Sequence, residues 1–130
     1  MHCTPTGFTI LRDIQYCVGV SLDEVTLTHQ QELRRGTAVL ACLTILREPG
    51  YGYALLERLA AAGLDVDAST LYPLLRRLER QGLLSSQWDT EQARPRKYYL
   101  TSSAGRELLR VLRADWMQLD RALRLLAEGA

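Results

Sequence analysis

In the first half of the chain the hydrophobic positions recur every three or four residues, which is the spacing of amphipathic helices. The first predicted helix covers residues 28–46, because Thr28 can cap its N-terminus and Gln31 lies three residues later, as in a capping box. A second helix is predicted to begin near Tyr51. Gly63 follows its last apolar positions and suits the left-handed conformation that often ends a helix.

The third predicted helix has the clearest pattern. Its N-cap lies within residues 67–69, residues 70–73 are expected to form its first turn, and Gly82 ends it. Leucines at i, i+3, i+4 and i+7 from Leu71 form one buried stripe. The opposite, polar face carries Ser69, Tyr72, Pro73, Arg76, Arg77 and Arg80.

Two strand-like runs follow, at residues 83–88 and 97–101, on either side of a polar segment at 89–95. This arrangement predicts a β-hairpin with a longish loop. Three helices followed by a hairpin predict a mostly α fold with a small β-hairpin, the winged helix-turn-helix. Trp88 is interpreted as a core or inter-strand aromatic, and of Tyr98 and Tyr99 one is expected in the core.

A long amphipathic helix is predicted from residue 102 or 103 to Glu128. Its apolar positions step by three and four residues, like the seam of a coiled coil. A small three-helix core cannot cover so long a helix, so the seam is expected to pack against a second copy of the chain in a homodimer. The seam residues are Leu109, Leu112, Trp116, Leu119, Leu123 and Leu126.

The positions of the charged residues along the chain are more informative than their sum. The chain has 16 basic and 15 acidic residues, and every basic residue except Lys97 is arginine. Residues 68–97 hold six of the basic and three of the acidic residues, so the basic excess falls on the third helix and the hairpin. Such local clustering favours nucleic-acid contact, whereas the net charge of +1 does not.

Composition excludes several classes of protein. No apolar run is long enough to span a bilayer, and no secretory signal is present, so a cytoplasmic protein without membrane contact is expected. Three cysteines without CxxC spacing argue against a disulfide framework or a metal site. No nucleophile elbow, phosphate loop or HExxH motif occurs, and we expect neither catalysis nor a cofactor.

Several strings of the sequence resemble the PadR family of bacterial transcriptional regulators. They are Tyr51-Gly52-Tyr53-Ala54-Leu55, residues 69–79, Gly82-Leu83-Leu84, residues 94–101 and Ala104-Gly105-Arg106. The resemblance implies a homodimeric winged-helix repressor of near-palindromic operators that dimerises through its last helix. Some members of the family respond to phenolic acids or hydrophobic drugs. Ser69 departs from the glycine that the family often has there.

The resulting domain prediction has three parts: a leader at residues 1–27, a winged-helix DNA-binding domain at 28–101 and a dimerisation helix at 102–130. The leader contains short β-prone runs at residues 8–11 and 16–20. Three interpretations stay open for it: a strand pair, a loose arm, or the product of a start codon assigned too early.

The third helix is the candidate recognition helix for double-stranded DNA. Tyr72, Arg76 and Arg80 share one face, and arginine can read guanine in the major groove. The alternative is a solvated face neutralised by Glu79 and Glu107. The further DNA-binding candidates on this helix are Ser69, Thr70, Pro73 and Arg77.

The hairpin and the second helix add candidates for phosphate contact. Arg94, Arg96 and Lys97 would position the protein on the DNA backbone, unless they only make the loop soluble. Tyr51 opens the second helix, where unpaired N–H groups favour an anion, although core packing would explain a tyrosine there equally.

Trp116 on the predicted seam has two interpretations. It packs in the dimer interface, or it stacks against a small hydrophobic effector. The function predicted for the whole chain is a DNA-binding transcriptional repressor. The competing class is a winged-helix dimer that binds a protein or a hydrophobic ligand without specific DNA binding.

Overall fold

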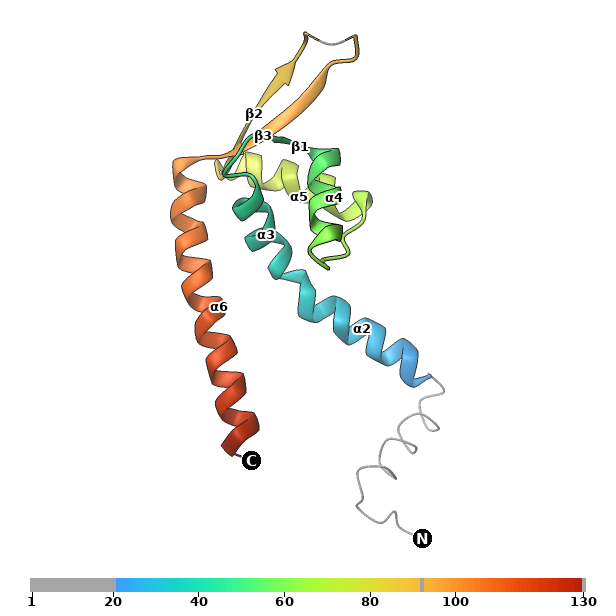
Figure 1. Ribbon diagram of the computed structural model, residues 1–130, viewed down its shortest axis with the longest axis vertical. Helices are drawn as coiled ribbons and strands as arrows, with labels where there is room; N and C mark the ends of the chain where they lie inside the picture. The colour runs from blue at the N-terminus through green and yellow to red at the C-terminus, as the bar shows by residue number, and fades with distance from the viewer. Residues whose placement is uncertain (1–20, 92, 130) are drawn as a thin grey trace. The chain divides into compact units, whose positions relative to one another are not determined.

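The computed structural model describes residues 21–91 and 93–129, which are mostly helical with one small antiparallel sheet (Figure 1). The chain divides into two units, residues 1–36 and 37–130. The predicted fold class, mostly α with a small hairpin, is confirmed.

In the first unit, helix α2 runs from Leu22 to Arg35 and has no buried residue. Ser21 caps it, because the serine side chain accepts a hydrogen bond from the Glu24 N–H at 3.1 Å. The predicted start at Thr28 is therefore wrong. Thr28 lies inside α2, and its hydroxyl donates to the Glu24 carbonyl.

These bounds change two further expectations. Because α2 begins at Leu22, the end of the leader at residue 27 does not coincide with the start of a helix. The single helix predicted over 28–46 is two helices, with Gly36 between them, as expected of a residue that weakens a helix interior. The predicted strand runs at residues 8–11 and 16–20 lie outside the described residues.

The second unit contains the winged helix. Its elements in chain order are α3 (Thr37–Ile45), β1 (Gly50–Tyr51), α4 (Gly52–Ala61), α5 (Ala68–Arg80), β2 (Leu84–Asp89), β3 (Arg96–Thr101) and α6 (Ser103–Gly129). The strands β2 and β3 form a hairpin that projects past α4 and α5, and α6 leads away from the foot of this hairpin (Figure 1).

The sheet has the antiparallel order β1-β3-β2. In the hairpin, Leu84 lies opposite Thr101 and Trp88 opposite Lys97. The two-residue strand β1 was not predicted, since a run so short has no alternation to detect. Tyr99 is the buried member of its tyrosine pair.

The core lies where α3, α4, α5, the sheet and the start of α6 meet. All four stripe leucines of α5 are buried, as predicted. Thr101 is buried too, and its hydroxyl donates to the Leu43 carbonyl at 2.9 Å. The Cys42 side chain is fully buried, and burial raises the pKa of its thiol to about 12.

Two glycines end the helices that flank the turn of the helix-turn-helix. Gly63 after α4 has φ of 87° and Gly82 after α5 has φ of 77°. Both values lie in the left-handed region that other residues rarely adopt, which confirms the two predicted helix ends.

Helix α6 joins the domain through its first turns only. Ser102 caps it by accepting the Gly105 N–H at 3.1 Å, and Leu109 packs in the core. Beyond Leu112, every described residue of the helix except Asp120 is exposed. Within the described ranges, no helix has the length and apolar character of a membrane span.

Candidate nucleic-acid interface

The first turn of α5 is held by Asp67, which belongs to the predicted N-cap segment. Its side chain accepts the Thr70 N–H at 3.1 Å. Hydrogen bonds from Thr70 and Ser69 keep the pKa of Asp67 below its usual value. The predicted place of Pro73 is wrong: because the cap is Asp67, Pro73 lies in the second turn, where its missing N–H leaves the Ser69 carbonyl without a helical partner.

The outward face of α5 is cationic. Arg76, Arg77 and Arg80 are exposed and form no ion pair with any described residue. Glu79 instead pairs with Lys97, and Glu107 pairs with Arg110. The two carboxylates named as neutralising partners therefore do not neutralise the α5 arginines.

Glu79 connects the recognition-helix candidate to both strands of the hairpin. The Ser86 hydroxyl donates to Glu79 Oε2, and Lys97 Nζ donates to Oε1 at 3.0 Å. These bonds, the Ser86 bond first, hold the pKa of Glu79 below its ordinary value. The Lys97 ammonium, a predicted phosphate contact, is thus engaged within the chain and also lies over the Tyr99 ring.

Tyr51 is engaged as well. Its hydroxyl donates to Asp89 Oδ2 at 2.7 Å, and this bond is the main cause that raises the pKa of Tyr51. The Arg96 guanidinium lies over its ring at 5.3 Å from the centroid, and Tyr98 meets it edge-on. The tyrosine thus contacts the loop end of the paired strands, and its hydroxyl is engaged within the chain.

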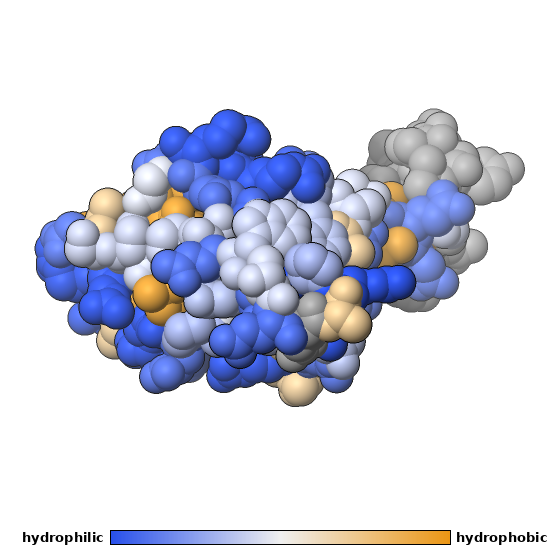
Figure 2. Space-filling model, turned by 90° about the horizontal axis from the view of Figure 1, so that it is seen from above, coloured by the Kyte–Doolittle hydropathy of each residue, from blue (hydrophilic) through white to orange (hydrophobic). Residues whose placement is uncertain are grey.

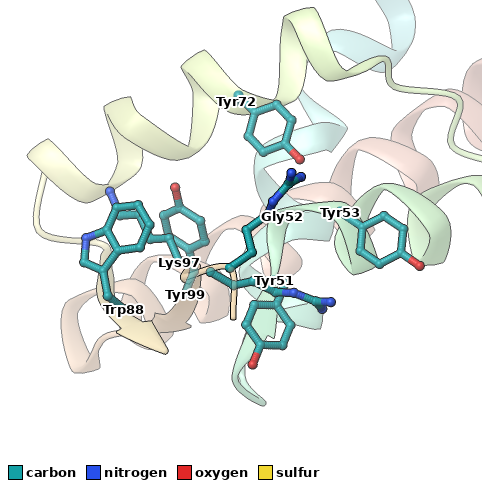
Figure 3. Close-up of a pocket in the computed structure, with 9 residues that line it drawn as sticks. Tyr51, Gly52, Tyr53, Tyr72, Trp88, Lys97 and Tyr99 are labelled. Atoms are coloured by element: carbon teal, nitrogen blue, oxygen red, sulfur yellow. The ribbon is translucent and has the colours of Figure 1, made fainter. Parts of the chain in front are cut away.

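A groove of about 580 Å³ lies where α4, α5 and the hairpin meet (Figure 3). Tyr53 and Trp88 lie on opposite sides of it, and Tyr72 projects from α5 between them. Gly52 packs closely against Tyr72 in this groove, and a Cβ at this position would come within 2.6 Å of the Tyr72 ring. The lining residues are Tyr51, Gly52, Tyr53, Tyr72, Trp88, Arg94, Arg96, Lys97 and Tyr99.

Sequence reasoning missed part of this groove. The structure brings the predicted residues Tyr51, Tyr72, Arg94, Arg96 and Lys97 together there. Of the two interpretations of Trp88, the core one is wrong, since 63% of the residue is exposed, whereas its place in the hairpin opposite Lys97 agrees with an inter-strand aromatic. Tyr53, Gly52 and Tyr99 were not singled out as site residues. The signal available for Gly52 and Tyr53 was the Tyr-Gly-Tyr string at the start of α4.

The face that carries the hairpin is mostly hydrophilic. Seen from that end, the hydrophobic side chains form only small separate spots (Figure 2). Such a surface suits a charged partner better than an apolar one.

The predicted seam on α6 divides into two parts. Leu109 packs in the chain's own core and is not available to a second chain, which corrects its place in the seam, and Leu112 is half-buried. The three-and-four spacing of apolar residues continues without interruption from the core-packed start of α6 into its exposed second half. The remaining seam residues are exposed: Trp116, Leu119, Leu123 and Leu126.

The family comparison agrees with this architecture. The model of the transcriptional regulator PadR-like family matches residues 39–111, from α3 to the first half of α6. This match covers more than half of the chain, so the chain belongs to the PadR-like family of transcriptional regulators. Members of the family are regulators and not enzymes, in agreement with the expected lack of catalysis.

Similar proteins support this assignment. A PadR family transcriptional regulator from Eggerthella lenta is 48% identical, with a TM-score of 0.78 over 83% of this chain and 96% of that one. A PadR-like transcriptional regulator from Bacillus cereus is 26% identical, with a TM-score of 0.69 over 76% and 99% of the two chains. A transcriptional regulator of Mycobacterium tuberculosis is 41% identical over 59 residues, which are 45% of this chain and 55% of that protein.

Proposed function

We propose that this chain is a sequence-specific DNA-binding repressor that acts as a homodimer on an inverted-repeat operator. One observation carries the proposal: three exposed arginines on α5 have no carboxylate partner in the described structure. A polar helix face of this kind fits the major groove, where arginine recognises guanine through two hydrogen bonds.

In the proposed complex, α5 reads bases and the hairpin contacts the backbone. Arg76 and Arg80 lie one helical turn apart on the exposed face and would contact base edges. Ser69 and Thr70 lie near the N-terminus of α5, where short polar side chains suit phosphate contact. Arg94 in the loop of the hairpin would add phosphate contact that depends on salt.

The second part of the proposal is dimerisation through α6. A two-fold axis would place two α5 helices in successive major grooves, about 34 Å apart. The exposed Trp116, Leu119 and Leu123 would then be buried between the two chains. An aromatic effector would stack on Trp116, and any change it makes in the affinity for DNA would be reciprocal.

A gel-shift titration tests the DNA-binding part. The probe is the duplex immediately upstream of the gene that encodes the chain, with scrambled duplex as competitor at physiological salt. The wild type should give a discrete complex that resists the competitor. Arg76→Ala/Arg80→Ala should weaken that complex at least about 30-fold, because each base contact contributes about 1–3 kcal/mol.

Arg106→Ala/Arg121→Ala is the matched control. It removes the same charge from exposed positions on α6 and should leave operator affinity within a few-fold of the wild type. Equal losses in both double variants would reduce the interaction to general electrostatics. A wild-type complex that disappears with competitor would favour the protein-interaction or ligand-binding alternative.

A further inference from the structure

The groove beside α5 contains an exposed tryptophan whose position in the hairpin explains its exposure. On β2, Leu84, Ser86 and Trp88 point to the same side, because side chains alternate along a strand. Leu84 is buried in the core, and Ser86 reaches Glu79 on α5. Trp88 lies one step further toward the hairpin tip, and 63% of its surface is exposed.

The polar groups of the groove divide into engaged and available ones. Lys97 is held by Glu79, and the Tyr51 hydroxyl is held by Asp89. Arg94 is exposed and makes no ion pair with any described residue, and Arg96 is exposed while its guanidinium covers the Tyr51 ring. Because Arg96 and Tyr51 lie on the face of the sheet opposite to Trp88, the Trp88 side of the groove offers Arg94 and an indole to a partner.

The groove is open at both sides. Tyr53 and Trp88 stand at opposite sides and are 61% and 63% exposed (Figure 3). A pocket for a small molecule encloses most of its ligand, whereas a groove with open ends admits a polymer that passes through it. Tyr72 lines the groove and shares a helix face with Arg76, so the groove continues the arginine face of α5.

We propose that this groove holds the sugar–phosphate backbone of one strand of duplex DNA, with the Trp88 indole against a deoxyribose and a phosphate at Arg94. This inference rests on the proposed function and adds an uncharged contact to it. An indole has a flat apolar surface that suits a sugar, and guanidinium groups suit phosphate. Such a contact does not depend on base sequence.

The first test uses Trp88 as its own reporter. The sequence has two tryptophans, so Trp116→Phe leaves Trp88 alone, and size-exclusion chromatography checks that its oligomeric state is unchanged. The probe is the duplex that the wild type selects from a random-sequence pool. Its binding, followed by anisotropy of a labelled end, should quench or blue-shift Trp88 emission and protect it from acrylamide.

The second test separates the uncharged contact from the charged ones. Trp88→Ala should weaken binding about tenfold, without changing the slope of log K against log salt. The loss should be the same for the selected and the scrambled duplex. Arg94→Ala should reduce that slope by about two, because the proposed dimer carries two copies of the residue, and Trp88→Phe should keep most of the affinity.

Three results would overturn the inference, and they differ in what they imply for the proposed function. DNA binding with unchanged Trp88 emission and quenching would overturn this inference and leave the proposed function standing. A Trp88→Ala loss confined to the selected duplex would replace the sugar contact by a base contact and overturn it too. If the wild type bound no duplex at all, the proposed function and this inference would both fail.

Discussion

The Glu79 carboxylate accepts hydrogen bonds from both strands of the hairpin, through Ser86 and Lys97. On the other side of the sheet, Asp89 accepts the Tyr51 hydroxyl. These two side chains hold the hairpin at a fixed place beside the helices. A single acidic residue on α5 therefore has a structural role, although its neighbours in sequence are the arginines proposed to contact DNA.

Glu79 should also make stability depend on pH. Its pKa is lowered on folding, so its contribution is complete above its ordinary pKa and disappears as the pH falls through the lowered value. Glu79→Gln is expected to reduce the melting temperature at pH 7 by about 2–8 °C, and the gap to the wild type should narrow as the pH falls below the ordinary pKa of a glutamate. Circular dichroism melts from pH 7 to pH 3 measure this.

Glu107→Gln is the control for that experiment. Its partner Arg110 and Glu107 itself are 69% and 65% exposed, so solvent screens the pair and little change is expected. A melting difference for Glu79→Gln that stays constant over the whole pH range would contradict the role given to its charge.

At the scale of elements, the junction of β2, β3 and α6 is packed without spare room. Gly105 in the first turn of α6 lies so close to the Leu83 carbonyl and the Thr101 side chain that a Cβ has no place. The close approach lets Ser102 cap α6 while its hydroxyl donates to the Gly82 carbonyl at 2.6 Å. The position of α6 relative to the hairpin thus depends on this glycine.

Gly105→Ala is expected to lower the free energy of unfolding by about 1–3 kcal/mol, because the helix must move away from the backbone of Leu83. Urea unfolding measures this. Gly129→Ala, at the far end of the same helix, meets no neighbouring atom within 4 Å and should leave stability nearly unchanged. Equal stability of the two variants would show that the junction tolerates a side chain.

The sequence predicted the helices and strands better than it predicted which of them pack against one another. The stripe that begins at Leu71 identified the buried face of α5, because helical periodicity is a local property. The sequence also placed Trp88 in the first strand of the hairpin, as a core or inter-strand aromatic. Whether α5 extends far enough to cover Trp88 there is a tertiary property, so its exposure could not be predicted. The pairing of Lys97 with Glu79 likewise depends on the packing of α5 against the hairpin.

At the scale of the whole molecule, the second half of α6 is an apolar surface without a partner in the described structure. The helix has 27 residues, a length of about 40 Å, and its core contact Leu109 lies in the first third. Exposed leucines at heptad spacing are typical of a surface buried by association. Association would therefore determine the distance between two α5 helices.

Leu123→Asp is expected to shift the chain from dimer to monomer, because a carboxylate in an apolar seam lacks a partner. Light scattering with size-exclusion chromatography measures the mass. Leu125→Asp is the matched control, since Leu125 is exposed to a similar extent, 65% against 62%, but lies off the seam. A monomeric wild type, or dissociation by both substitutions alike, would contradict this seam.

The buried thiol of Cys42 has a practical consequence. With its side chain enclosed and its pKa near 12, Cys42 can react with an alkylating reagent only during the brief intervals when the surrounding helices separate. Once Cys3 and Cys17 are replaced by serine, the rate of alkylation becomes a clock for those openings. Comparing the alkylation rate of Cys42 with and without DNA would show whether DNA binding at the surface changes how often the core opens.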